Sequence, residues 1–115
     1  MNRKIGGHVS TAGGLLNAIR NTQLIEASCM QIFAGSPRSW ARAVIDDETA
    51  NKFNSQIKQL NLAPVYIHAL YLINLTSSNK ITLEKSIEAL KLELQSSVLI
   101  KSAGVILHIG SYTDR

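Results

Sequence analysis

Two short apolar runs, each ending in a histidine, constrain this chain more than any other feature of its sequence. Residues 65–67 are Val, Tyr and Ile, which suit a buried pleated strand, and His68 follows directly. Residues 104–107 repeat the design and end at His108. A long helical pattern separates the two runs. Strand, helix and strand, with a histidine at the carboxyl end of each strand, is how an α/β barrel presents side chains at one face.

The earlier part of the chain follows the same alternation. Residues 4–9 are interpreted as a first short strand, loosened by Gly6 and Gly7, and His8 lies near its end. Residues 28–33 are a compact apolar run. Apolar residues at helical spacing follow each run: Leu15, Leu16, Ile19, Thr22 and Ile25 after the first, and Ala50, Phe53, Ile57 and Leu60 after the second. Asp46 and Asp47 predict an N-cap and an acidic first turn for the second helix.

The third helical pattern is the longest, and Asn79 or Thr82 is suited to cap it. One side carries apolar residues: Leu83, Ile87, Leu90, Leu94 and Val98. The other side carries charges: Glu84, Lys85, Glu88, Lys91 and Glu93. We expect the apolar side to face the core, and the charges to form solvated surface rather than catalytic carboxylates.

The order β-α-β-α-β-α-β with short connections predicts parallel strands joined by right-handed crossovers. An open flavodoxin-like sheet would fit this order, but no glycine-rich phosphate-binding loop follows the first run. A closed TIM (β/α)8 barrel normally needs about 250 residues, and this chain has 115. We therefore expect residues 1–115 to form about four β units, the N-terminal half of a single α/β TIM-barrel domain, with further site residues outside the chain.

Composition limits the function classes more than it selects one. The chain is 45% hydrophobic and 17% charged, as in a soluble globular protein. A net charge of +4 is compatible with a polyanionic partner, although the cations are scattered. The single cysteine, Cys29, excludes an intrachain disulfide. No signal peptide or membrane-length apolar run occurs, so we expect a cytosolic or nuclear setting and no membrane partner.

The repeated histidines raise the question of a metal site. His108 follows His68 by 40 residues, roughly one βα repeat, so neighbouring strands should hold both at one rim. Neutral imidazole binds zinc well. A histidine at a strand end is alternatively a hydrogen-bonded structural residue or a general acid. The residues alone leave both interpretations open.

The segment 38–42 mixes two arginines with the only tryptophan. Such a loop beyond a strand end suits contact with a nucleic acid, with Trp40 stacking and Arg38 reaching a phosphate or a groove. The alternative, which we favour for Trp40, is that its ring folds back onto the barrel rim. Arg38 is harder to explain in that way.

Four sequence segments, in this order, resemble the N-terminal part of endonuclease IV, the zinc-dependent apurinic/apyrimidinic (AP) endonucleases. They are IGGHVSTAGGL (5–15), QIF with PRSW (31–33 and 37–40), HALYLINL (68–75) and LHIGS (107–111). The resemblance covers essentially the whole chain. It implies a phosphoric diester hydrolase of base excision repair, which cuts duplex DNA 5′ to abasic sites with zinc-activated hydroxide.

The resemblance also implies roles for individual residues. His68 and His108 match family ligands of a trinuclear zinc cluster, and the remaining ligands are expected beyond Arg115. Loop positions that enter DNA at the lesion match Arg38, Tyr71 and Leu72, and His8 matches a supporting histidine near the active centre. The complete protein is then expected to be a monomer in the cytoplasm, associated with the nucleoid, or nuclear or viral in a non-bacterial source. The 115 residues alone are expected to be inactive.

Two other functions remain as alternatives. A metal-dependent sugar isomerase or epimerase of the same barrel superfamily would share ligands at strand ends, but would not need loops like those of Arg38 and Tyr71. A non-catalytic DNA-binding fragment would lack the later ligands. A strand-ending glutamate about one βα repeat after His108, in the continuing reading frame, would favour the endonuclease.

Overall fold

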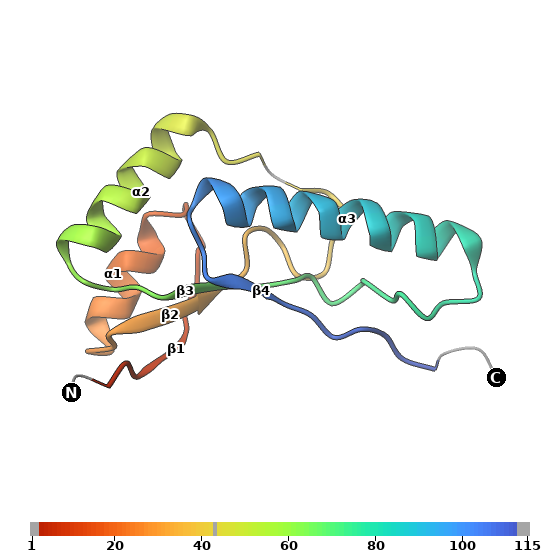
Figure 1. Ribbon diagram of the computed structural model, residues 1–115, viewed down its shortest axis with the longest axis horizontal. Coiled ribbons are helices and arrows are strands. Elements are labelled where there is room, and N and C mark those ends of the chain that lie inside the picture. Colours follow the sequence, from red (N-terminus) through yellow and green to blue (C-terminus); the bar gives the residue numbers. More distant parts are fainter. Residues whose placement is uncertain (1–2, 43, 113–115) are drawn as a thin grey trace.

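The structure, a computed structural model, describes residues 3–42 and 44–112. Its elements alternate as predicted: β1 (Gly6–His8), α1 (Asn17–Leu24), β2 (Cys29–Ile32), α2 (Asp47–Gln59), β3 (Val65–His68), α3 (Lys80–Leu99) and β4 (Gly104–Ile106). The four strands form one parallel sheet in the order β1-β2-β3-β4. Figure 1 shows all three helices on the same side of this sheet. Within residues 3–42 and 44–112, no helix covers the other side.

The alternation of side chains along the strands separates these two faces. Ile32 of β2 and Ile67 of β3 are paired in register, and both are fully buried beneath the helices. Gln31 and Tyr66 are also paired but point the opposite way, and Tyr66 is 39% exposed. Successive residues of a strand point to opposite faces, so one face packs in the core and the other stays open.

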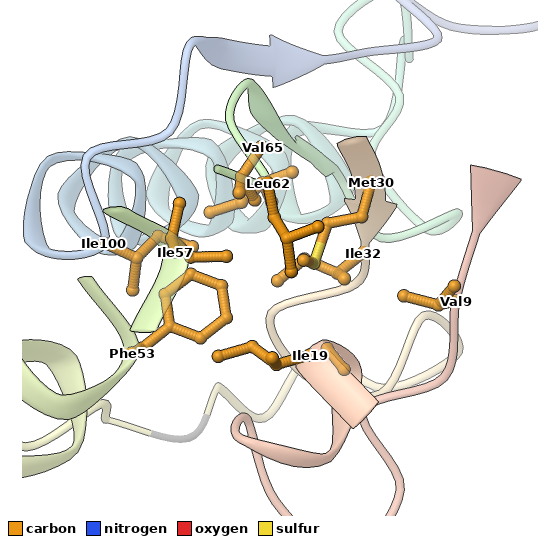
Figure 2. Packing of buried hydrophobic residues seen from close by; sticks show 11 residues of the cluster. Val9, Ile19, Met30, Ile32, Phe53, Ile57, Leu62, Val65 and Ile100 are labelled. Carbon is orange, nitrogen blue, oxygen red and sulfur yellow. The ribbon is translucent and has the colours of Figure 1, made fainter. Parts of the chain in front are cut away.

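The core lies between the sheet and the first two helices (Figure 2). Helix α1 buries Ala18, Ile19 and Thr22, and α2 buries Ala50, Phe53 and Ile57. The Asp46 carboxylate accepts a hydrogen bond from the Thr49 amide at 2.7 Å, which confirms the predicted N-cap of α2.

The predicted apolar faces of these two helices each end in a residue that is exposed in the structure. Ile25 and Leu60 are 57% and 40% exposed. Both are C-cap residues at which the helix ends, so the helical spacing that would turn them toward the core stops there.

The predicted core-facing side of α3 is wrong at Ile87, Leu94 and Val98, which are exposed, and right at Leu90, which packs against a buried cluster. The helix buries Ser86, Ala89, Glu93 and Ser97. Apolar residues occur on both sides of this helix, so their spacing does not decide which side packs. The side that packs carries small residues, and the Ser86 hydroxyl accepts a hydrogen bond from the backbone N–H of Asn74 at 2.9 Å.

No helix in the described parts of the chain is long and apolar enough to cross a membrane.

We predict that the 115-residue chain expressed alone will self-associate. Strands β1 and β4 are the outer strands of the sheet, so each leaves one edge of backbone groups without a strand partner among residues 3–42 and 44–112. The uncovered face adds exposed apolar side chains, including Tyr66 and Ile106. Light scattering after size exclusion should show oligomers, with the full-length gene product as control. A monodisperse monomer with a cooperative thermal transition would contradict this expectation.

Candidate functional site

The register of the sheet brings three histidines to one end of it. His8 pairs with Gln31, and His68 pairs with Ile106, two residues before His108. Side chains two residues apart along an extended chain point to the same face of the sheet. The carboxyl ends of the parallel strands therefore deliver the histidines to a common rim.

The histidine rings form a cluster with one aromatic ring. The centroids of His68 and His108 are 5.2 Å apart, and those of His8 and His68 are 6.5 Å apart. Phe33, just beyond β2, lies 4.4 Å from His8 and 5.3 Å from His68. The rings of His68 and His108 are thus close enough to act on one ligand, while Phe33 packs between His8 and His68.

A backbone hydrogen bond determines the tautomer of His68. Its Nδ1 lies 2.7 Å from the carbonyl oxygen of Ala69, which can only accept, so Nδ1 carries the proton. Nε2 then keeps its lone pair. A histidine with one ring N–H donated to a carbonyl, and the other nitrogen free, is in the form that ligates metals.

His8 is held in the opposite tautomer. The Gln31 side-chain amide donates to its Nδ1 at 2.9 Å, which places the proton of the neutral ring on Nε2. Burial lowers the pKa of His8, and its electrostatic interaction with His68 lowers that pKa further. His8 is therefore a neutral hydrogen-bond donor at this site and does not have the free nitrogen of a ligand.

The histidines fit part of a metal site. Zinc sites in proteins use four ligands, and imidazole nitrogen is among the preferred donors. Within residues 3–42 and 44–112, no group of three or more His, Cys, Asp or Glu side chains is placed to hold a metal ion. His68 and His108 thus supply two suitable donors, and a complete site requires donors from elsewhere.

Comparisons with known proteins give one consistent relationship. No protein-family model matches the chain. The chain is 35% identical to the probable endonuclease 4 of Halothermothrix orenii over 112 residues, which are 97% of this chain and 40% of the relative. It is 36% identical to the probable endonuclease 4 of Streptomyces avermitilis over 110 residues, 95% of this chain and 35% of the relative.

The crystal structure of endonuclease IV from Thermus thermophilus superposes with a TM-score of 0.89 at 32% identity. The alignment covers 95% of this chain and 41% of that one. Over nearly its whole length, the chain is similar to endonuclease IV. It spans about 40% of the length of the curated relatives it matches, and it corresponds to their N-terminal portion. Its fold is accordingly the N-terminal half of the TIM barrel of endonuclease IV, as the strand order predicts.

The three residues that the endonuclease IV resemblance assigns to DNA lie on exposed loops. Arg38 is exposed in the segment after β2, and Tyr71 and Leu72, after β3, are 56% and 37% exposed. The Tyr71 ring contacts His68 at 5.8 Å and Phe33 at 5.3 Å. These loops therefore stand beside the histidine rim.

Trp40 does not join that exposed group. It packs against a buried cluster that includes Leu70 and Ile73, and the Lys85 ammonium lies 6.0 Å from the centroid of its ring. The interpretation that Trp40 folds back onto the rim is confirmed.

Sequence reasoning did not assign Phe33 or Gln31 to the site. Gln31 orients His8, and Phe33 touches His8, His68 and Tyr71. The sequence could have indicated both residues, because residues 31 and 33 are two apart in the second apolar run and so point to the same face, at the strand end nearest the histidines.

A cavity of about 560 Å³ lies next to His8 and Phe33, and neither His68 nor His108 lines it. It is therefore adjacent to the histidine pair rather than centred on it.

Proposed function

We propose that this chain is part of a DNA repair endonuclease that hydrolyses the phosphodiester 5′ to abasic sites in duplex DNA. The observation that carries the proposal is the position of the His68 and His108 rings, 5.2 Å apart and beside the exposed Tyr71. The similarity to proteins named endonuclease 4 supports the same reaction class. The products would be a 3′-hydroxyl and a 5′-deoxyribose phosphate.

His68 and His108 would hold zinc as neutral ligands within a trinuclear cluster completed by residues outside this chain. Zinc, when bound, supplies a water of lowered pKa and positive charge for the phosphate oxygens. The carbonyl of Ala69 prepares His68 for this role by holding the proton on Nδ1. His8 would donate from Nε2 without entering the ligand set, in keeping with a supporting role.

Arg38, Tyr71 and Leu72 would recognise the lesion. Tyr71 and Leu72 are large and partly apolar, and both are exposed at the rim, as suits side chains that enter a stack of bases. An abasic nucleotide is the least costly place to unstack and kink a duplex, because no base has to leave the stack. Arg38 adds an exposed cation beside them for the phosphate backbone. The protein would accordingly act in the compartment that holds the DNA.

The direct test uses the full-length gene product and a duplex with one abasic analogue. We expect a single nick on the 5′ side of the analogue, loss of nicking with a zinc chelator, and recovery when zinc is restored. An intact duplex of the same sequence is the matched control. Equal cutting of both duplexes, or turnover of an aldose or ketose without nicking, would contradict the proposal and favour the isomerase alternative.

Tyr71→Ala should weaken binding of the abasic duplex by about tenfold, in line with the ~1–3 kcal/mol of an aromatic stacking contact to a nucleic acid. Zinc content should not change, because the Tyr71 ring touches His68 without supplying a ligand. Fluorescence anisotropy and metal analysis measure the two quantities, and Tyr71→Phe, which keeps the ring, is the control. Zinc loss matching the loss of binding would show that Tyr71 belongs to the metal site instead.

A further inference from the structure

A buried ion pair links the loop that carries Arg38 to helix α3. Nη1 of Arg42 lies 2.8 Å from Oε1 of Glu93, and the two side chains are only 7% and 1% exposed. Glu93 was predicted to lie on the solvated side of α3, and this prediction is wrong. The carboxylate enters the interior because the guanidinium of a residue 51 positions away meets it there.

The same guanidinium holds the backbone on both sides of Arg38. Nη2 of Arg42 donates to the carbonyl oxygens of Ser36 and Ser39. Between them, the carbonyl oxygen of Pro37 accepts from the Tyr71 amide at 2.7 Å. We refer to residues 36–42 as the Arg38 turn. Three of its carbonyls thus accept hydrogen bonds from Arg42 or Tyr71, while the Arg38 side chain is left exposed.

Glu93 is the point to which this arrangement is anchored. Burial raises the pKa of Glu93, and the Arg42 guanidinium, followed by the Leu70 amide, opposes that rise. The Arg38 turn is bound to this carboxylate through Arg42. The hydrogen bond from the Tyr71 amide to the Pro37 carbonyl in turn joins the Arg38 turn to the loop after β3.

The ion pair is not arranged to give the greatest stability. Nε of Arg42 and Oε2 of Glu93 are buried without a hydrogen-bond partner in the described part of the chain. Replacing a buried ion pair by apolar side chains of similar volume is often neutral or stabilising. Its geometry does achieve one thing that an apolar pair cannot, because the guanidinium donates to the carboxylate and to two carbonyls together.

We propose that Glu93, acting through Arg42, is a positioning residue that holds the Arg38 turn in the conformation that meets damaged DNA. The inference deepens the proposed function and rests on it. Glu93 touches neither DNA nor metal in this role. It fixes the backbone from which Arg38 projects, and it keeps that backbone against the amide of Tyr71.

The kinetic test uses the full-length gene product and an abasic duplex. Glu93→Gln should raise KM about tenfold and leave kcat and zinc content unchanged, as expected for lost binding that is equal in ground and transition states. Arg38→Ala should raise KM similarly, and the two substitutions together should raise it no further than Arg38→Ala alone. Glu88→Gln, an exposed carboxylate on the same helix, is the matched control and should have no effect.

A second variant separates positioning from stability. Arg42→Met combined with Glu93→Leu should melt at or above the wild-type temperature and still show the raised KM, because the carbonyls of Ser36 and Ser39 lose their donor. Recovery of both the melting temperature and KM would overturn the proposal. So would effects of Glu93→Gln and Arg38→Ala that multiply.

Hydrogen exchange provides a readout that does not depend on activity. In Glu93→Gln, peptides covering residues 36–42 should exchange faster than in the wild type, while peptides covering β2 and β3 should not change. Unchanged exchange in the Arg38 turn would overturn the positioning role. Faster exchange in a protein that does not nick abasic duplexes would reject the proposed function and leave the mechanical role of Glu93 in place.

Discussion

Replacing His68 by alanine should reduce nicking of an abasic duplex by about 10³-fold or more, since metal stabilisation of a phosphoryl transition state contributes several kcal/mol. The lone pair of His68 Nε2 is available to a metal because the Nδ1 proton is donated to the carbonyl oxygen of Ala69. Alanine removes that donor and leaves the His108 ring without its neighbour 5.2 Å away. His108→Ala should have the same result. Single-turnover nicking and metal analysis of the full-length gene product provide the measurements.

His8→Ala is the matched control for these substitutions. His8 belongs to the same cluster, and its ring centroid lies 6.5 Å from that of His68. The Nδ1 of His8 already accepts a hydrogen bond from the Gln31 side-chain amide. We expect His8→Ala to retain zinc and to lose about tenfold in rate, the lower end of the roughly 10–100-fold typical of residues around a metal site that are not ligands. Equal zinc loss in all three variants would show that the division into two ligands and one supporting residue is incorrect.

Asn74→Ala should destabilise the protein by about 2–4 kcal/mol and lower its zinc content. The side-chain Oδ1 of Asn74 accepts from the Thr76 backbone amide at 3.1 Å and the Thr76 hydroxyl at 2.8 Å, and its Nδ2 donates to the Ser111 carbonyl at 3.0 Å. The side chain thereby ties the loop after β3 to the segment that follows His108. Without it, buried polar groups lose partners and His108 is less firmly placed. Urea unfolding and metal analysis measure both effects.

Two further variants define what this result means. Gly110→Ala disturbs the same junction from the other side, because a Cβ at residue 110 would come 2.3 Å from the side-chain Oδ1 of Asn74. Its effects on stability and zinc content should therefore resemble those of Asn74→Ala. Asn54→Ala removes a single hydrogen bond, from Nδ2 to the Leu99 carbonyl at 2.9 Å, far from the histidines. It should cost about 1 kcal/mol and leave zinc content unchanged. Zinc loss in Asn54→Ala would mean that metal retention reports only global stability.

Most of the fold was predictable from local pattern. The β-type runs before His68 and His108, and the stripes that include Ile19 and Phe53, predict the order of elements and hence a parallel sheet. Such patterns are reliable because a strand or helix buried on one side must repeat its apolar residues with the period of that element. The exposed Ile25 and Leu60 mark the limit, because helix ends are set by capping that spacing does not encode.

Helix α3 shows why the remainder was not predictable. Its apolar residues occur on more than one side, so the period is compatible with burying Leu94 or burying Glu93. The side that is buried depends on Arg42, 51 positions away, because its buried guanidinium pairs with the Glu93 carboxylate. Spacing along one helix contains no information about such a partner.

The alternation of strands and helices and the delivery of His8, His68 and His108 to one rim can be derived from local sequence, because both depend on periods and strand ends within short segments. Which of those imidazoles keeps a free nitrogen follows from three-dimensional contacts, since Ala69 and Gln31 fix opposite tautomers. The same holds for the burial of Glu93 under the Arg38 turn. Both outcomes depend on contacts between groups whose separation in space the sequence does not state.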